Sequence, residues 1–382
     1  MAITQKEIRI NLVAVSRLFR ICLVCVFLLL GCTADYDYPE NIILFIGDGM
    51  GVAHITAEKI VRGNINLERF SVMGLVTTHS ADHLVTESAA AATALATGYK
   101  TNNRAISVSV DRQPLKTLFE YAKERGKSVG VVVTSSVTNA TPAAFMAHAN
   151  DRRQQADIAE QIAYSNIDVL IGGGWAYFVP AANPGSKRKD QKNLLAALET
   201  RMPVILTEDK LSASVQADNH KLAALLSPDG LPKAADRDYS LTQLTRSAIH
   251  LLSKNPNGFV LMVEGSQIDW AAHAHDQQDL IAELIDFDDA VGAGLDFAEK
   301  NRTTLMVVTA DHETGGLAVH DGSVQNRQVT ATAFTTTGHT AAMVPLFAYG
   351  PGSTRLSGIQ DNARVGRTLI ELLLKREIKF NP

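Results

Sequence analysis

Six short runs rich in Val, Ile, Leu and Phe constrain the fold of this chain more than any other feature of its sequence. Runs of this length and composition are typical of strands that are buried on both faces of a parallel sheet. Between them, residues 114–125 and 241–254 place apolar residues at helical spacing. The alternation predicts an α/β fold, with a mostly parallel central sheet covered by helices on both faces. The predicted strands are Asn41–Ile46, Ser128–Thr134, Ile167–Ile171, Gly258–Val263, Thr304–Thr309 and Val344–Tyr349.

The first 32 residues differ in character from the rest of the chain. Four basic residues and a single acidic residue precede an apolar run at 21–30, which is too short to span a bilayer as a helix. This is the pattern of a signal peptide. The run ends in Leu29-Leu30-Gly31-Cys32, which resembles a bacterial lipobox; the alternative is an ordinary signal peptide that is cleaved nearby. We expect a lipoprotein signal peptide over 1–32, lipidation of Cys32, and an exported protein anchored to a membrane in the periplasm or at the cell surface.

Composition limits what the remaining chain can be. The 382 residues are 46% hydrophobic and 20% charged, which is typical of a globular protein. The net charge of −4 leaves no basic surplus, so we expect no nucleic-acid partner. We expect a single domain over 33–382 and no disulfide in it, because the three cysteines all lie within the first 32 residues. Between 175 and 240 the strand signal weakens, and Pro, Gly and basic residues predict a surface excursion without a domain boundary.

Polar residues collect where the predicted strands end. In open α/β sheets, ligands bind outside the carboxyl ends of the strands, so side chains that follow strands are candidates for the site. A single acid such as Asp48 is more often a helix cap or a turn former. Together, however, the strand ends carry four carboxylates and three imidazoles, which would repel or remain unpaired without cations. These residues are Asp48, Glu264, Asp269, Asp311, His273, His312 and His339.

The types and spacing of these residues predict metal sites. Asp269 and His273 are four residues apart, so a helix would present both on one face, and His339 completes a set of three. Asp48, Asp311 and His312 form a second set. Mixed His and Asp ligands are typical of zinc, whereas an oxygen set suits magnesium. Glu264, with Asp48 shared, supplies oxygen ligands for a third and harder ion.

An alanine-rich segment, 85–98, predicts a helix that begins near Ser88 and ends before Gly98. On its own, Ser88 is most simply a helix N-cap. Free N–H groups at a helix N-terminus also bind anions, so Ser88 could be both part of a phosphate cradle and a nucleophile. Both interpretations remain open from the residues alone.

Six segments, in the same order along 41–352, resemble the alkaline phosphatase family. The resemblance implies that Ser88 is the nucleophile and that Arg152 binds the phosphate. It also implies one zinc ion at Asp269, His273 and His339, a second zinc ion at Asp48, Asp311 and His312, and a magnesium ion at Asp48, Thr141 and Glu264. The segments are NIILFIGDGMG at 41–51, VTESAAAATALATG at 85–98, TNATPAAFMAHANDR at 138–152, FVLMVEGSQIDWAAH at 259–273, VVTADHETGG at 307–316 and GHT at 338–340.

Three positions depart from the family pattern. Glu87 stands where the family usually has Asp beside the nucleophile, which adds a methylene near Arg152. Asn139 and Trp270 occupy two variable positions near the third metal, where some members carry histidines. Because an Asn amide is a weak oxygen donor and Trp is no ligand, we expect magnesium at the third site.

The resemblance implies hydrolysis of small-molecule phosphate monoesters through a phosphoserine intermediate. A phosphodiesterase built on the same scaffold is the nearest alternative. A sulfatase is excluded because Ser88 is followed by Ala89-Ala90-Ala91 rather than by the Pro and Arg context of that family. A surface lipoprotein that binds a phosphate-bearing partner without turnover is an alternative from another class. A homodimer is a further expectation, because the family is commonly dimeric.

Overall fold

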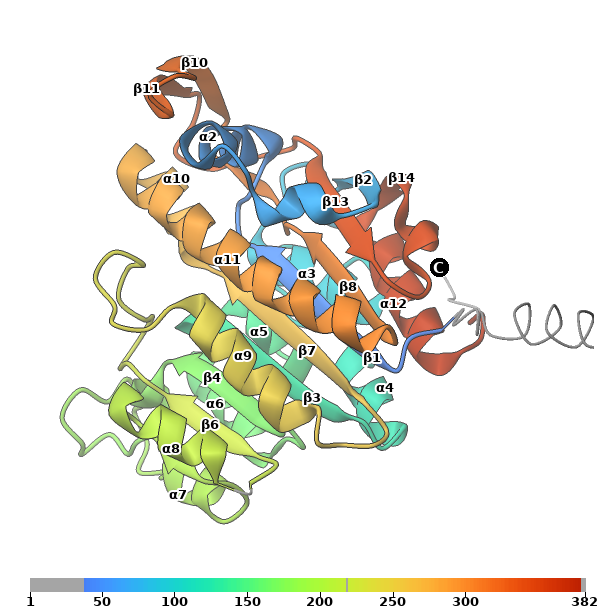
Figure 1. Cartoon of the computed structure of the whole chain (residues 1–382). Helices are drawn as coiled ribbons and strands as arrows, with labels where there is room; N and C mark the ends of the chain where they lie inside the picture. The colour runs from blue at the N-terminus through green and yellow to red at the C-terminus, as the bar shows by residue number, and fades with distance from the viewer. Residues whose placement is uncertain (1–37, 218, 379–382) are drawn as a thin grey trace, which may run out of the picture. The chain divides into compact units, whose positions relative to one another are not determined.

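The computed structural model describes residues 38–217 and 219–378, so the predicted signal peptide and Cys32 lie outside the described residues. Within the described ranges, ten strands form one sheet in the order β14-β2-β13-β8-β1-β7-β3-β4-β6-β5. The fold class predicted from the sequence is confirmed: the sheet is mostly parallel and helices cover both of its faces (Figure 1).

The six predicted strands are all present, and three of them form the centre of the sheet. Strand β1 (Asn41–Gly47) lies between β8 (Thr304–Thr309) and β7 (Phe259–Gly265), parallel to both. Every residue of these three strands is buried, which explains their uninterrupted apolar runs. Beyond β7 follow β3 (Ser128–Ser136) and β4 (Val169–Gly173).

One strand of the sheet runs in the opposite direction. Strand β13 (Val344–Tyr349) is antiparallel to β8 on one side and to β2 (Val72–Thr77) on the other, and β14 (Gly358–Asp361) pairs parallel with β2. The amino end of β13 therefore lies at the edge where the parallel strands end. This reversal explains how residues that precede β13 reach the same edge as residues that follow the other strands.

Two layers of helices pack on the sheet, and their ends carry recognisable caps. Helix α9 (Leu241–Leu252) begins with a capping box in which Ser240 and Gln243 bond to each other's backbone N–H groups. It packs with the long helix α11 (Gln277–Asn301) over β3, β7, β1 and β8, in front of the sheet in Figure 1. On the opposite face lie α3 (Ser88–Thr97), α4 (Leu118–Glu124), α5 (Ala140–Met146), α6 (Gln155–Tyr164) and α12 (Asn362–Leu374).

The predicted surface excursion at 175–240 needs a correction. Two of its segments are strands that extend the main sheet beyond β4, and β6 is fully buried. These strands are too short, at two and four residues, to give a clear apolar run. The segment contains η2 (Trp175–Tyr177), α7 (Leu194–Glu199), β5 (Val204–Ile205), η3 (Glu208–Lys210), α8 (Leu211–Gln216) and β6 (Leu222–Leu225).

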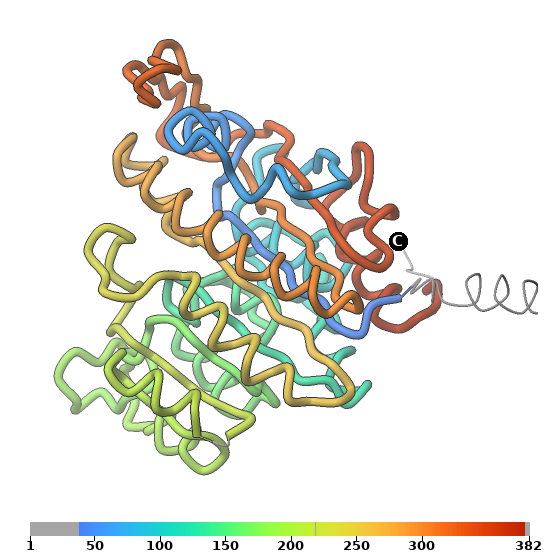
Figure 2. The backbone as a smooth tube through the Cα atoms, viewed as in Figure 1, coloured from blue at the N-terminus to red at the C-terminus, as the bar shows by residue number. Residues whose placement is uncertain are grey.

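A hairpin of β10 (Leu317–Ser323) and β11 (Gln328–Phe334) lies outside the main sheet and contacts α2 (Val52–Arg62), as the trace in Figure 2 shows. None of the helices in the part of the chain that the structure describes has the length and apolar character needed to cross a bilayer. The remaining elements are η1 (Asn66–Arg69), α10 (Gln267–His273), β9 (Glu313–Thr314), β12 (His339–Thr340) and η4 (Ser353–Leu356).

Candidate active site

Three central strands end in carboxylates at one edge of the sheet. Asp48 follows β1, Glu264 is the second-last residue of β7, and Asp311 lies two residues beyond β8. The strand register pairs Ile46 of β1 with both Glu264 and Thr309, so the three chain segments leave the sheet at the same level. All three carboxylates are buried. The structure thus brings Asp48 together with two residues, Glu264 and Asp311, that lie more than 200 positions further along the sequence.

The turn after β1 requires a glycine. Gly49 has a φ of 73°, and a Cβ atom there would lie 2.7 Å from the hydroxyl oxygen of Thr314. The N–H group of Gly49 donates to Oδ1 of Asp311 over 3.1 Å. The turn therefore connects the segment that carries Asp48 directly to the segment that carries Asp311 and His312.

The first predicted ligand set is assembled around one imidazole nitrogen. Nε2 of His312 lies 3.4 Å from Oδ1 of Asp48 and 3.2 Å from Oδ2 of Asp311. Both of these carboxylate oxygens are buried and have no hydrogen-bond partner among the described residues. Unpartnered buried oxygens facing an imidazole fit a bound cation, because burial without a partner is costly.

The second predicted set lies beside the first. Oδ1 of Asp269 is 3.3 Å from Nε2 of His273 and 3.6 Å from Nε2 of His339, and these two nitrogens are 3.3 Å apart. Ligands held about 2.0–2.1 Å from a tetrahedral zinc ion are about 3.3–3.4 Å from one another, so this trio fits zinc. The rings of His312 and His339 stack with centroids 3.5 Å apart, which makes the two sets neighbours. Asp269, His312 and His339 also lie close enough to share an ion.

The third predicted set offers oxygen atoms. Thr141 lies in the first turn of α5, and its buried hydroxyl has no hydrogen-bond partner among the described residues. Oε2 of Glu264 accepts hydrogen bonds from Ser266 over 2.7 Å and Ser135 over 3.4 Å, which orients this carboxylate. Glu264 also acts electrostatically on Asp48. The donor set fits a hard cation such as magnesium.

The protein groups alone leave these carboxylates in an unfavourable electrostatic environment. Burial raises the pKa of Asp48 well above its usual range, and the charges of Asp311 and Asp269 raise this pKa further. Burial likewise raises the pKa of Glu264 to about 7. Cations in the three sets would remove this penalty, because a nearby positive charge favours the ionised carboxylate.

Thr314 is a site residue that the sequence patterns did not single out. Its buried hydroxyl donates to Oδ1 of Asp269 over 2.5 Å and lies 3.2 Å from Nδ1 of His312. A hydrogen bond at Nδ1 leaves Nε2 of His312 free for a metal, as is usual for metal-binding histidines. The only sequence signal was its position two residues after His312.

Ser88 is the first residue of α3, and Glu87 is the N-cap. The interpretation of Ser88 as the helix cap is therefore wrong, because the carboxylate of Glu87 accepts from the N–H groups of Ala89 and Ala90. These two N–H groups are thereby unavailable for the predicted phosphate cradle. The hydroxyl of Ser88 is buried and lies 3.4 Å from Nε2 of His312, next to the first ligand set. The helix ends before Gly98, as predicted, and Gly98 has a φ of 77°.

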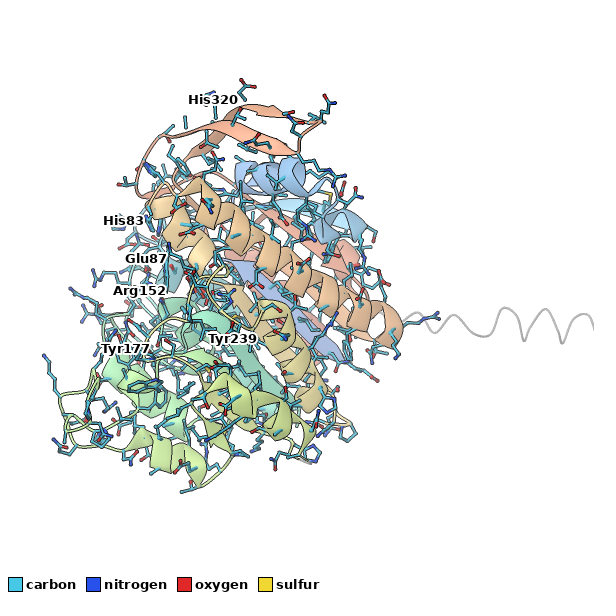
Figure 3. The ribbon with its side chains drawn as sticks, turned by 60° about the vertical axis from the view of Figure 1, so that its left-hand side comes forward. His83, Glu87, Arg152, Tyr177, Tyr239 and His320 are labelled. Atoms are coloured by element: carbon cyan, nitrogen blue, oxygen red, sulfur yellow. The ribbon has the colours of Figure 1, made fainter. Side chains whose placement is uncertain are left out.

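Arg152 lies beside the nucleophile candidate. Its Nη1 is 2.7 Å from Oε2 of Glu87, and its Nη2 donates to Oδ1 of Asn139 over 3.0 Å. Figure 3 shows Glu87 and Arg152 side by side. The longer side chain of Glu87 thus both reaches Arg152 and caps α3.

Two further positions that depart from the family pattern have structural roles, one as a helix cap and the other in packing. Asn139 is the N-cap of α5 and accepts from the N–H group of Ala140 over 2.6 Å. The ring of Trp270 lies against Gly230, where a Cβ atom would be 2.6 Å from Cη2. Neither an amide nor an indole supplies a nitrogen ligand for a metal held by Thr141 and Glu264.

The α/β sheet and the histidine and carboxylate groups at its carboxyl edge define a metal-binding hydrolase. A family model described as alkaline phosphatase matches residues 39–326. Alkaline phosphatase 3 of Bacillus subtilis is 33% identical over 91% of each chain. Alkaline phosphatase 4 of the same bacterium is 39% identical over 75% of this chain, which spans 64% of that relative's length. The chain belongs to the alkaline phosphatase family and is a phosphatase.

Solved structures agree with this assignment. The alkaline phosphatase of the Antarctic bacterium TAB5 is 38% identical, with a TM-score of 0.82 over 89% of this chain and 100% of that chain. A variant of the TAB5 enzyme described with Mg bound in the M3 site has a TM-score of 0.81, at 39% identity over 88% of this chain and 98% of that chain. The cold-active enzyme of Shewanella sp. is 31% identical, with a TM-score of 0.78 over 87% of this chain and 99% of that chain.

Proposed function

We propose that this chain hydrolyses phosphate monoesters to an alcohol and inorganic phosphate through a phosphoserine intermediate on Ser88. The observation that carries the proposal is the position of the Ser88 hydroxyl. Ser88 is the first residue of the buried helix α3, and its hydroxyl lies 3.4 Å from Nε2 of His312. A serine hydroxyl among unpartnered metal-type ligands is a nucleophile that a cation can activate. Zinc ions would be held by Asp48, Asp311 and His312 and by Asp269, His273 and His339.

Arg152 and Ser88 have different roles in the proposed reaction. Arg152 can present two N–H groups to two phosphate oxygens, a bidentate geometry that lysine lacks. The hydroxyl oxygen of Ser88 attacks phosphorus, the bond to the ester oxygen breaks, and the leaving alcohol takes up a proton. Water then attacks phosphorus from the opposite side, the bond to Ser88 breaks, and phosphate leaves while the serine regains its proton. Bound zinc supplies Lewis acidity that stabilises negative charge on oxygen.

Magnesium is our proposal for the third ion, held by Asp48, Thr141 and Glu264. The support is the oxygen-only donor set and the identity of Asn139 and Trp270, neither of which supplies a nitrogen ligand. The similarity to a TAB5 variant with bound Mg is consistent with this choice.

We further propose a single catalytic domain over 33–382 behind a lipoprotein signal peptide, with the lipid on Cys32. The support is the sequence pattern at 21–32. An exported protein anchored at a membrane, in the periplasm or at the cell surface, follows from this pattern. We also propose a homodimer, and its only support is that members of the family are commonly dimeric.

The test compares turnover of an aryl phosphate monoester with turnover of an aryl phosphate diester on one preparation whose metal content is measured. We expect the monoester to be strongly preferred by enzyme that contains two zinc ions and one magnesium ion. Preference for the diester would support the phosphodiesterase alternative. Tight phosphate binding without turnover would support the non-catalytic alternative.

A further inference from the structure

A buried carboxylate lies behind the ligand sets and takes no part in them. Glu313 directly follows His312 and is the first residue of β9, yet the residue is only 6% exposed. Strand β9 pairs antiparallel with β12, which puts Glu313 opposite Thr340 and Thr314 opposite His339. Each of these strands is two residues long, so backbone pairing alone gives them little stability.

The carboxylate of Glu313 accepts hydrogen bonds from β12 and from the segment that follows β9. Oε2 accepts from the hydroxyl of Thr340 and from the N–H group of Gly316 over 3.2 Å. Oε1 accepts from the N–H group of Leu317 over 3.2 Å. One side chain therefore ties the segment that carries His312 to the strand that carries His339.

The turn after Asp48 packs against the same side chain. A Cβ atom on Gly51 would lie 2.5 Å from Cγ of Glu313, so only glycine allows this approach. The N–H group of Gly51 donates to Nδ1 of His54 over 3.0 Å, and this fully buried nitrogen lies 4.0 Å from Oε1 of Glu313. The side chain of Glu313 thus packs against a third ligand-bearing segment.

We propose that Glu313 is a positioning residue for both zinc sites. It fixes the relative positions of three segments that carry Asp48, His312 and His339, without binding metal or substrate itself. Residues that orient metal ligands from behind typically change metal affinity or activity by about 10–100-fold when they are replaced. The inference rests on the proposed zinc sites and adds a residue that the family motifs do not assign as a ligand.

A purely structural role predicts a different result. A buried carboxylate that ties strands together would affect the free energy of unfolding but not the zinc affinity of the folded protein. Asp168 is a matched control, because it is also buried and accepts from the N–H group of Val129 over 2.9 Å and from Lys123 over 2.8 Å. It lies at the amino ends of β3 and β4, opposite the ligand sets.

The experiment measures zinc affinity of the full chain by competition with a chromophoric chelator, alongside urea unfolding of the metal-free protein. We expect Glu313→Gln to lower zinc affinity about 10–100-fold, and Asp168→Asn to lower stability while leaving affinity within about twofold of wild type. The absorption spectrum of the cobalt-substituted protein should change in Glu313→Gln and not in Asp168→Asn, because it reports ligand geometry.

Wild-type zinc affinity in a folded Glu313→Gln variant, or an equal loss in Asp168→Asn, would overturn the inference. If Glu313→Gln does not fold, Thr340→Val decides, because it removes one donor and keeps the carboxylate. We expect that variant to bind zinc several-fold more weakly, and unchanged affinity would again overturn the inference. Absence of zinc binding by wild-type protein would instead refute the proposed function itself.

Discussion

Arg152 illustrates how one residue depends on the chain around it. Its guanidinium contacts Glu87 and Asn139, and these two residues are the N-caps of α3 and α5. Burial raises the pKa of Glu87, but Arg152 and the backbone N–H groups of Arg104 and Ala90 outweigh burial and hold this pKa below its usual value. An ionised Glu87 therefore orients Arg152 beside Ser88.

The first prediction concerns the planar fork of Arg152. Arg152→Lys keeps the charge but loses the paired N–H groups, so we expect kcat/KM for a monoester to fall about 10–100-fold. The matched control is Arg153→Lys at the exposed neighbouring position, where the side chain bonds only to Asp151 among described residues. We expect its kcat/KM to stay within about twofold of wild type. Similar losses in both variants would mean that Arg152 has no special role.

The second prediction concerns the choice of the third ion. Asn139→His introduces an imidazole next to Thr141, so we expect zinc to replace magnesium there. Anomalous scattering above the zinc edge measures this directly. Asn193→His is the control, because Asn193 is also a helix N-cap but lies on α7. A strong third zinc peak in wild-type crystals grown with excess magnesium would contradict the prediction.

Site residues that directly follow a buried strand could be identified from the sequence. Residues that support the predicted ligands through contacts between segments could not. Asp48 and Asp311 could be predicted because polar residues directly after buried strands stand out. Glu313, Thr314 and His54 could not, because their importance lies in contacts with residues 27 to 259 positions away along the chain. No local pattern records such contacts.

At the scale of elements, α2 and α11 meet around a buried acid. Glu58 of α2 is 1% exposed and lies near Asp288 and Asp289 of α11, with Arg62 3.8 Å from its Oε1. Burial, reinforced by the charge of Asp288 and opposed by Arg62, raises the pKa of Glu58 to about 9. The folded state therefore holds a proton that the unfolded state releases above its ordinary pKa of 4.5.

The third prediction follows from this proton. The contribution of Glu58 to stability should fall as pH rises from about 4.5 to about 9, because at this residue the unfolded state binds fewer protons than the folded state in that range. Glu58→Gln removes the titration, so its Tm should exceed that of wild type by a margin that grows by at least about 2 °C between pH 6 and pH 9. Thermal unfolding at both pH values measures the margin. Glu199→Gln, at the exposed end of α7, is the control and should show no such growth.

Whether an element could be predicted depended on its burial. The central strands are buried on both faces and gave continuous apolar runs. Strand β2 has exposed residues such as Met73, and β14 contains polar Gln360 and Asp361, so neither gave a recognisable pattern. Strands at or near a sheet edge lose the signal because solvent replaces one packing partner.

At the scale of the whole chain, the fourth prediction concerns the anchor, which lies outside the described residues. Lipid on Cys32 should hold the protein at a membrane, because each buried CH₂ contributes about 0.8 kcal/mol. We expect Cys32→Ala to release the protein or leave it unprocessed. Cys25→Ala, within the same leader, should be processed and anchored as wild type. A mature N-terminus elsewhere without lipid, seen by mass spectrometry, would refute the anchor.

The description of the whole molecule as a catalyst depends on one chemical event, phosphoryl transfer to Ser88. The site supports it because the hydroxyl lies 3.4 Å from Nε2 of His312 in the first ligand set, and the preceding residue, Glu87, binds Arg152. Replacing the serine should leave the ligand sets intact, since their members come from other segments.

The fifth and most direct measurement is to quench the enzyme during turnover of a monoester labelled on phosphorus and to map the labelled residue by mass spectrometry. We expect covalent phosphate on Ser88 in wild-type protein. Ser88→Ala should carry no label while retaining its zinc, measured on the same sample. Covalent phosphate on another residue of the wild-type enzyme, or label on the Ser88→Ala variant, would contradict the account.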